Sequence, residues 1–380
     1  MKKRVLGILL TGVLTLSLLA GCGKEEVQES PVQGAKETTA EETDITETNT
    51  GDAEPALTGK PLRVGTMAKA MGLPLKYAQD KGYFADRGLE IEIVTFATGA
   101  PINEAMNAGE LDVAVSGMAS VYSLATGNYT YIGDTMISEK GQSLYVRPNS
   151  PIAACESVND IIGSAETVKG MSILGPLSTS AQYNAIKYVE SFGLTANDFT
   201  MVSMEYAQAY QAFITGEGDG IASTPPYAFQ LEDAGMVKVA DVSTLMGQPL
   251  TDGIFVPNEI VEERRADLQV LLEVYYQACQ ELLDDEALRA EVGMNWYAEE
   301  GVTYSEEDMA NEIMAQTYTT LDNLKSEDYE FGATMTNMGQ FFSTQGLIET
   351  ENLSNIENSF DTSFVEKIIG NSVKTSHIEQ

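Results

Sequence analysis

The sequence predicts an α/β protein with two similar lobes, each a mostly parallel sheet flanked by helices, and a ligand cleft between them. The first observation is a repeat at an offset of 107 residues, in which Glu104–Ser116 and Gln211–Ser223 share an alanine, a glycine, a glutamate, an aspartate and a serine. Each copy has the pattern of a helix end, a glycine that stops the helix and a short apolar strand. Helices and strands also alternate around both copies, which is typical of parallel βαβ units.

The first lobe is expected to begin with the strand Leu62–Gly65 and the helix Pro74–Lys81. The next segment, Leu89–Phe96, alternates apolar and polar residues with a period of two, which indicates a strand. A proline near its start predicts the helix Ile102–Ala108, and the apolar segment that ends at Ser116 is the next strand. A helix that stops at residue 127 and strands at residues 131–134 and 141–146 are expected to follow.

The same order of elements restarts after Pro148 and Pro151, which we interpret as a stiff crossover. The second lobe is expected to contain strands at residues 171–175, 199–204, 221–223 and 237–240 and helices at residues 183–192 and 207–213. Thr251–Pro257 then returns to the first lobe, and the amphipathic helix Val261–Leu283 and acidic C-terminal helices pack on that lobe. The predicted boundaries are residues 60–147 with 250–380 for the first lobe and 148–249 for the second.

The N-terminus has the pattern of a secretory signal. Three basic residues precede an apolar run, which ends in Leu-Ala-Gly-Cys at Cys22. This ending resembles the bacterial lipobox, so residues 1–21 are expected to be removed and Cys22 to carry a lipid. Residues 22–59 are acidic and polar, as expected of a disordered tether. This layout predicts a protein anchored to the outer face of the membrane of a Gram-positive cell; an ordinary signal peptide or an anchor helix with an incidental cysteine is the alternative.

Composition excludes several classes of function. The formal net charge of −35 argues against nucleic acid and against docking on an anionic membrane surface. The chain has one histidine, His377, close to its end, so a histidine-based metal site or catalytic triad is not expected, and neither is a cofactor. Cys155 and Cys279 either form a disulfide or are free thiols, with Cys279 buried on the apolar side of its helix; the sequence leaves this open.

The loops that follow the predicted strands are the candidate ligand site, because ligands of such sheets bind at the carboxyl ends of the strands. Their hydroxyl and backbone N–H groups suit an anion or a carbonyl, and their methionines and tyrosine suit an apolar wall. The candidate ligand-binding residues are Thr66, Met67, Met71, Thr98, Ser116, Gly117, Met118, Ser178, Thr179, Ser180, Thr224, Pro226, Tyr227 and Asp252.

Each candidate also has a plain structural interpretation. Ser178 or Ser180 would cap the helix that follows, any single methionine would belong to the core, and Asp252 would form a turn instead of binding an amine or a pyrimidine. No arginine lies in the predicted loops, so a sulfonate or phosphate would rest on helix N-termini and hydroxyls alone. Arg147 is expected at the crossover, where it touches the ligand or braces the hinge.

Three segments carry a family resemblance: K-P-L-R-V-G, K-G-Y-F-A-D-R-G-L-E-I-E-I-V and N-A-G-E-L-D-V-A-V-S-G. They resemble the sulfonate, nitrate, taurine and thiamine-precursor branch of type II solute-binding proteins. The second-lobe segment G-D-G-I-A-S-T-P-P-Y is similar to the family's strand that leads into the cleft. The resemblance covers residues 62–283 and implies the type II periplasmic-binding-protein fold, closure of two lobes on the ligand, and an ABC permease with its ATPase as partners of a monomer.

Three classes of function remain. The first is a lipid-anchored receptor of an importer, whose ligand is an alkanesulfonate-, taurine- or nitrate-like anion or a thiamine-related pyrimidine or heterocycle. The second is an enzyme on the same fold, since thiamine-degrading and pyrimidine-making relatives exist. Those enzymes need a cysteine or histidine that the predicted loops lack, so we expect no enzyme. The third is a sensor or adhesin on the same scaffold.

Overall fold

The structure is a computed structural model that describes residues 56–378. The predicted signal peptide at residues 1–21, the lipidation site Cys22 and the tether up to residue 55 lie outside the described residues. The tether is predicted to extend to residue 59, but Thr58 already donates hydrogen bonds from its N–H and its hydroxyl to Asp267, at 3.0 and 2.5 Å. The ordered contacts therefore begin slightly earlier than the sequence predicts.

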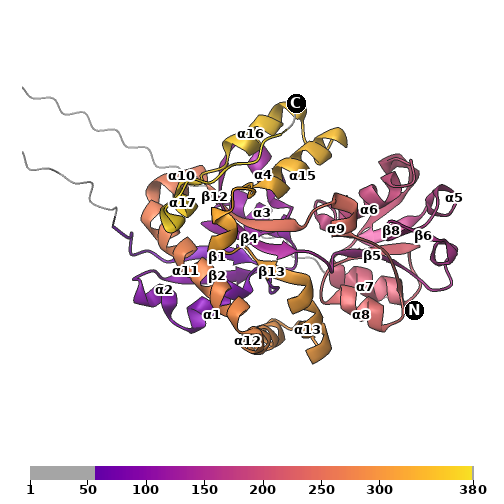
Figure 1. The fold of residues 1–380 in the computed structure, drawn as a ribbon, viewed down its shortest axis with the longest axis horizontal. Helices are drawn as coiled ribbons and strands as arrows, with labels where there is room; N and C mark the ends of the chain where they lie inside the picture. Colours follow the sequence, from indigo (N-terminus) through magenta and orange to yellow (C-terminus); the bar gives the residue numbers. More distant parts are fainter. Residues whose placement is uncertain (1–55, 379–380) are drawn as a thin grey trace, which may run out of the picture. The chain divides into compact units, whose positions relative to one another are not determined.

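The first lobe is built on a six-stranded sheet (Figure 1). Its order is β13 (Gln316–Tyr318), β4 (Tyr129–Ser138), β12 (Leu250–Pro257), β3 (Val113–Ser116), β1 (Leu62–Thr66) and β2 (Ile91–Thr95). The second lobe has a five-stranded sheet. Its order is β11 (Val237–Asp241), β5 (Ser143–Val146), β10 (Gly220–Ser223), β8 (Ser172–Gly175) and β9 (Thr200–Ser203), and a small hairpin of β6 (Ser157–Val158) and β7 (Ile161–Ile162) is separate from it.

The two sheets share one arrangement, which confirms that the chain holds two similar α/β lobes. In each sheet three neighbouring strands are parallel, β3-β1-β2 in the first and β10-β8-β9 in the second. The next strand in each sheet is antiparallel, and the chain enters it directly after crossing from the other lobe. This strand is β12 in the first sheet, where it pairs with β3, and β5 in the second, where it pairs with β10. Both sheets are therefore mixed, and the prediction of mostly parallel sheets is correct only for their three-stranded halves.

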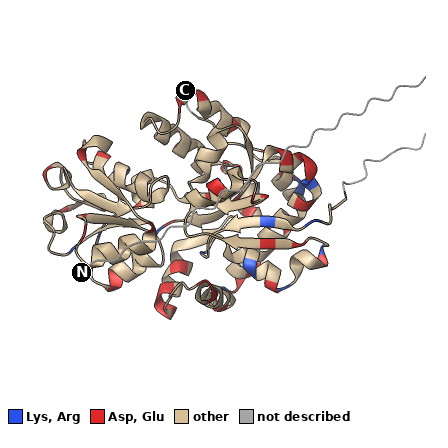
Figure 2. Cartoon of the chain, turned by 180° about the vertical axis from the view of Figure 1, so that it is seen from behind, with Lys and Arg blue, Asp and Glu red and all other residues tan. Residues whose placement is uncertain are grey.

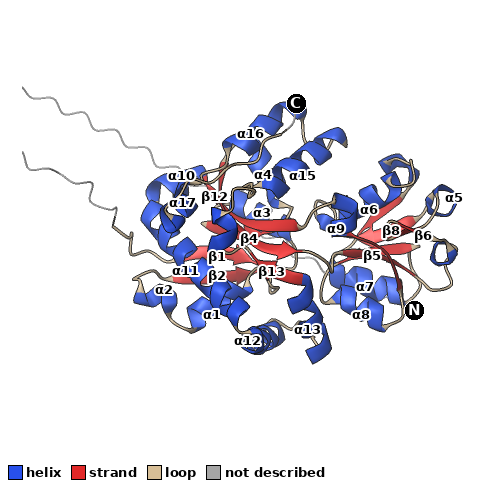
Figure 3. Cartoon of the chain, viewed as in Figure 1, coloured by secondary structure: helices blue, strands red, loops and turns tan. Residues whose placement is uncertain are grey.

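Helices cover both sheets (Figure 3). Those of the first lobe are α1 (Leu73–Asp80), α2 (Tyr83–Asp86), α3 (Gly99–Asn107), α4 (Ser120–Ala125), α10 (Asn258–Glu263), α11 (Arg265–Asp284), α12 (Glu286–Glu299), α13 (Glu306–Ala315), α14 (Leu321–Lys325), α15 (Ala333–Thr344), α16 (Leu353–Asn358) and α17 (Ser363–Ile369), with a short 3₁₀ turn at Thr350–Asn352. Those of the second lobe are α5 (Ala165–Val168), α6 (Ser180–Glu190), α7 (Tyr206–Ile214), α8 (Tyr227–Asp233) and α9 (Val242–Met246), with 3₁₀ turns at Ile152–Ala154 and Ala196–Asp198.

The chain crosses between the lobes twice. The first crossing lies at residues 139–142, because β4 pairs in the first sheet and β5 pairs with β10 and β11 in the second. It precedes the boundary at residue 147 that the sequence predicts. The second crossing lies at residues 247–249, between α9 and β12. Arg147 is correspondingly inside the second lobe, where its guanidinium donates to the carbonyl oxygens of Phe213, Glu217 and Gly218 at the end of α7.

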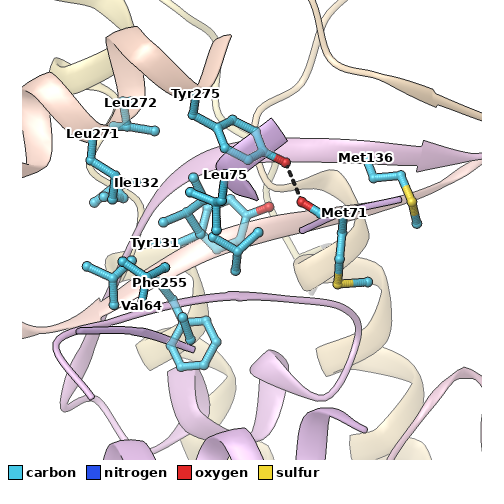
Figure 4. Packing of buried hydrophobic residues seen from close by; sticks show 14 of the residues in the cluster. Val64, Met71, Leu75, Tyr131, Ile132, Met136, Phe255, Leu271, Leu272 and Tyr275 are labelled. Atoms are coloured by element: carbon cyan, nitrogen blue, oxygen red, sulfur yellow. Dashed lines mark hydrogen bonds between the residues drawn. The ribbon is translucent and has the colours of Figure 1, made fainter. Parts of the chain in front are cut away.

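The largest hydrophobic core lies in the first lobe, between its sheet and the helices (Figure 4). The long helix α11 contributes Leu271, Leu272 and Tyr275, all fully buried, and the Tyr275 hydroxyl donates to the carbonyl oxygen of Met71 at 2.8 Å. The sequence predicts one helix over residues 261–283, whereas the structure breaks it into α10 and α11 at Arg264. Two smaller clusters pack against the second sheet.

Acidic residues are spread over the helices of both lobes in the view of Figure 2, and basic residues are few there. This distribution agrees with the acidic composition of the chain. In residues 56–378 no helix is long and apolar enough to cross a membrane. Within the same residues, Cys155 and Cys279 are both free, and Cys279 is buried in the core of the first lobe.

Candidate functional site

A cavity lies between the lobes where loops that follow parallel strands of both sheets meet. Its empty volume is about 560 Å³, including the space at its mouth. Met67 directly follows β1, Gly117 follows β3 and Thr224 follows β10, so the strand ends position the cavity wall. The lining residues are Met67, Lys69, Met71, Thr98, Gly99, Gly117, Met118, Ala119, Met136, Gln142, Thr179, Ser180, Tyr206, Thr224, Pro225, Leu250, Asp252, Glu312 and Gln316.

The structure brings most of the predicted site residues together. Those that line this cavity, which we call the inner cavity, are Met67, Met71, Thr98, Gly117, Met118, Thr179, Ser180, Thr224 and Asp252. Pro226 and Tyr227 instead line a second, outer cavity of about 940 Å³, which shares Met67, Lys69 and Tyr206 with the inner one. The two cavities are therefore neighbours.

Three predicted residues line neither of these cavities. Thr66 and Ser116 are the buried last residues of β1 and β3. Ser178 has a left-handed backbone with φ of 56°, and its N–H donates to the side chain of Gln182 at 2.8 Å. These positions shape the loops without contributing to the cavity wall.

Asp252 is a buried carboxyl group in the inner cavity, and its pKa is far above its ordinary value. Its side chain lies on β12, the residue is 1% exposed, and its Oδ2 has no hydrogen-bond partner among the described residues. Burial raises the pKa of Asp252 to about 7, and the charge of Lys69 opposes that shift. Gly117 leaves room for this carboxylate, because a Cβ at residue 117 would lie 2.8 Å from Oδ1.

Lys69 brings the opposite charge to the same cavity. Burial lowers the pKa of Lys69 to about 8, against the attraction of Asp252, Glu312 and Glu205. The residue as a whole is only partly buried, but its ammonium end is desolvated and lies 4.6 Å from the ring centre of Tyr206. Lys69 comes from the first lobe and Tyr206 from the second, so this contact joins the lobes.

The hydroxyl groups of the site differ in how far they are already engaged. The Thr179 hydroxyl caps α6: it accepts from the N–H of Ala181 and donates to the carbonyl of Pro176, at 3.2 and 3.0 Å. The sequence predicts a cap from Ser178 or Ser180, but Thr179 is the residue that caps α6, and Ser180 is the first residue of that helix. The Thr98 hydroxyl is buried without a partner among the described residues, and the same holds for Ser116 and Ser223 next to the cavity. An unmet buried hydroxyl costs free energy that a bound ligand or water would recover.

Several wall residues escape sequence reasoning. Lys69 is the one charged residue of the loop Thr66–Leu73, and a single cation among small and apolar residues is the sequence signal that could have identified it. Tyr206, the first residue of α7, gives no such signal. Glu312 and Gln316 come from the C-terminal part of the first lobe, far from the repeated segments in the sequence, and nothing in their local sequence indicates a cleft.

Glu312 is buried, with both carboxylate oxygens engaged. Its Oε1 accepts from the Tyr297 hydroxyl at 2.8 Å and its Oε2 accepts from the Tyr304 hydroxyl. Burial raises the pKa of Glu312, while these hydrogen bonds and the nearby Arg289 lower it. Glu312 therefore shapes the wall and its field, whereas Asp252 has an oxygen left to offer a ligand.

The cavity wall carries no metal-binding donor set: residues 56–378 contain no group of three or more histidine, cysteine, aspartate or glutamate side chains placed to hold a metal ion. The inner-cavity wall likewise includes neither cysteine nor histidine. The wall presents one free carboxylate oxygen, one ammonium group, hydroxyls and four methionines.

The chain matches a protein-family model and a named relative. The model of the NMT1-like family matches residues 56–294. A protein of Brachyspira hyodysenteriae named as an ABC transporter periplasmic binding protein is 30% identical over 312 residues, which is 81% of this chain and 89% of the relative.

Solved structures show the same fold at low identity. The alkanesulfonate-binding protein of Xanthomonas axonopodis pv. citri, bound to MOPS, superposes with a TM-score of 0.62 at 18% identity over 82% of this chain and 99% of that one. The nitrate-binding protein of Synechocystis PCC 6803 superposes with a TM-score of 0.67 at 13% identity over 83% of this chain and 90% of that one. These likenesses cover more of the chain than residues 62–283, over which the sequence carries the family resemblance. The chain belongs to the NMT1-like family, and its fold is that of the periplasmic binding proteins.

Proposed function

We propose that this protein is the solute receptor of an ABC importer, anchored by a lipid on Cys22 outside the cell membrane. It captures a small organic molecule between its lobes and delivers it to the permease. The relative in Brachyspira hyodysenteriae supports the importer assignment, and the inter-lobe cavity supports capture by closure. The L-A-G-C sequence at residues 19–22 supports the anchor.

The unpartnered Oδ2 of Asp252 inside the cavity carries the proposal for the ligand class. A buried carboxylate oxygen gains most from a hydrogen-bond donor that is itself charged or strongly polarised. We therefore infer that the ligand presents an amine or an aminopyrimidine-like donor to Asp252. A simple sulfonate or nitrate is disfavoured, because it has no hydrogen-bond donor to offer the unpartnered oxygen of Asp252, and the cavity wall contains no arginine to form a bidentate contact with it.

Thermal-shift screening of the mature protein tests this proposal. Amines and aminopyrimidines are expected to raise the melting temperature, because a ligand stabilises the folded state by mass action. Asp252→Asn is expected to weaken their binding about 10- to 100-fold, as for the loss of a charged hydrogen bond worth about 1.5–3 kcal/mol. Asp219→Asn is the matched control, since Asp219 bonds Ser172 at the start of β8, away from the inner-cavity wall and from both chain crossings.

Three results would contradict the proposal in different ways. Sulfonate or nitrate binding that survives Asp252→Asn would overturn the ligand class. A screen in which no small molecule shifts the melting temperature would overturn the receptor function. Cys22→Ala is expected to release the protein from the membrane fraction, so unchanged anchoring of that variant would refute the lipid attachment.

A further inference from the structure

Lys69 stands at the partition between the inner and outer cavities. It lines both of them, together with Met67 and Tyr206. Its ammonium group lies over the Tyr206 ring, at 4.6 Å from the ring centre. Among the described residues it forms no hydrogen bond and no ion pair with a carboxylate. The ammonium group therefore keeps its hydrogen-bonding capacity for something else in the cavity.

Asp252 and Lys69 are opposite charges in one cavity that do not meet. Each contributes to the electrostatic environment of the other, yet no carboxylate oxygen of Asp252 is within ion-pair distance of the Lys69 ammonium. The tyrosine ring on the second lobe holds the ammonium group, and β12 holds the carboxylate. Because the two desolvated groups do not pair with each other, the space between them has a hydrogen-bond donor, the Lys69 ammonium, at one end and an acceptor, the Asp252 carboxylate, at the other.

The other acidic groups near Lys69 do not close this gap. Glu312 has both oxygens bonded to the hydroxyls of Tyr297 and Tyr304. Glu205 lines the outer cavity and not the inner one. Within the described residues, Asp252 and Lys69 are thus the two charged groups of the inner cavity that remain open to a ligand.

We propose that the ligand is bipolar, with a donor head at Asp252 and an anionic or carbonyl acceptor at Lys69, and that Lys69 is the residue that selects for the acceptor. This inference rests on the proposed function and adds the second end of the ligand. A ligand with only one end would leave the opposite buried charge unpaired, whereas a bipolar ligand of matching length satisfies both. The residues of the second lobe that hold Lys69 and border the gap would then close over the acceptor end.

Matched sets of small probes test the two ends separately. One set is 4-aminobutanoate, butylamine and butanoate, and the homologous sets with shorter and longer chains vary the separation of the ends. Titration calorimetry on the mature protein is expected to show that the best aminocarboxylate binds at least tenfold more tightly than its amine or its carboxylate. Lys69→Met should remove the advantage over the amine, and Asp252→Asn should remove the advantage over the carboxylate.

Two further variants serve as controls for the charge of Lys69. Lys69→Arg keeps the positive charge and should keep the preference for the bipolar probe, while Lys238→Met removes an exposed lysine paired with Glu232 and should change nothing. Melting temperatures of the ligand-free variants establish that each is folded.

The outcomes separate this inference from the proposed function. If amines bind through Asp252 as tightly as the aminocarboxylates and Lys69→Met has no effect, the bipolar ligand is refuted and the receptor for a donor ligand stands. If no probe in any set binds, the bipolar ligand is refuted as well. The receptor function is then decided separately by the thermal-shift screen, which covers a wider range of compounds.

Discussion

At the scale of single residues, the buried carboxyl of Asp252 links the binding site to stability. Burial raises the pKa of Asp252 to about 7 in the folded protein, against about 3.9 in an unfolded chain. Between these values the folded state binds more protons than the unfolded state, so the contribution of this residue to stability is present below about pH 4 and is lost as the pH rises through about 7. At about 1.4 kcal/mol for each pKa unit, the loss is at most about 4 kcal/mol.

We therefore expect Asp252→Asn to be more stable than the unmodified protein at pH 8, and the difference to shrink towards pH 5. Chemical unfolding of both proteins at a series of pH values without ligand measures this. The same change at Asp241, whose carboxylate is bonded to Gly141 and Ser143, should not stabilise the protein at pH 8. A pH-independent difference between Asp252→Asn and the unmodified protein would show that the carboxyl of Asp252 does not titrate in this range.

The sequence located the site residues that depend on local chain geometry. Met67, Gly117 and Thr224 follow strands, and loops after parallel strands collect at one edge of a sheet whatever the rest of the chain does. It missed Tyr206 and Glu312, because their positions depend on how separate helices approach the cavity. No local pattern in a single sequence specifies that approach.

At the scale of elements, the helices of the two repeated segments end with the same backbone hydrogen bonds. The N–H groups of Gly109 and Glu110 donate to the carbonyls of Met106 and Ala105, and those of Gly216 and Glu217 donate to Phe213 and Ala212. Both glycines have positive φ, 70° and 110°, as a glycine that ends a helix does. Residues 107 positions apart in the sequence thus occupy equivalent positions at the two helix ends.

The repeated aspartates extend this equivalence to the strands. Asp112 accepts from the N–H of Arg63 at 2.8 Å, and Asp219 accepts from the N–H of Ser172 at 2.8 Å, so each ties its strand to the start of the neighbouring one. Their surroundings differ. Asp112 is buried and pairs with the guanidinium groups of Arg63 and Arg264, whereas Asp219 is exposed. The Arg63 hydrogen bonds and charge lower the pKa of Asp112 against the effect of its burial.

This difference predicts unequal costs for the same substitution. Asp112→Ala is expected to lower the free energy of unfolding by about 3 kcal/mol, because it removes a buried ion-pair partner. Asp219→Ala should cost about 1 kcal/mol, as for one exposed hydrogen-bonding group. Urea denaturation of the two variants provides the comparison, and equal losses would show that the two arginines add nothing to the repeat in the first lobe.

The sequence predicted the order of helices and strands well and the direction of some strands poorly. Hydrophobic period and glycine stops are local signals, and they placed β3 and β10 within a residue or two. The antiparallel strands β5 and β12 come from the opposite lobe. The sheet that each of them joins depends on where the chain crosses between the lobes, and no local sequence pattern marks that crossing. For this reason the sequence places β5 in the wrong lobe.

At the scale of the whole folded region, the C-terminal helices connect the lobes in addition to the two chain crossings. The Phe341 ring of α15 lies 4.7 Å from the Tyr183 ring of α6, and Gln345, which directly follows α15, donates to Glu190 of α6 at 2.9 Å. The Lys187 ammonium, also on α6, lies 5.4 Å from the Phe341 ring centre. These contacts join a first-lobe helix to a second-lobe helix. They are present in the same conformation of the protein that contains the inner cavity.

A receptor that closes on its ligand should therefore bind more weakly when this contact is lost, even though no residue of the inner cavity changes. An aromatic pair contributes about 0.5–1.5 kcal/mol, so Phe341→Ala is expected to reduce ligand affinity about two- to tenfold, because a smaller share of the molecules is closed. Phe192→Ala is the control, since that ring packs on Tyr188 within the second lobe and should affect stability but not affinity. Calorimetry gives the affinities, and small-angle X-ray scattering of the ligand-free proteins reports whether Phe341→Ala is more open. Unchanged affinity together with unchanged scattering would show that the α15–α6 contact does not control closure.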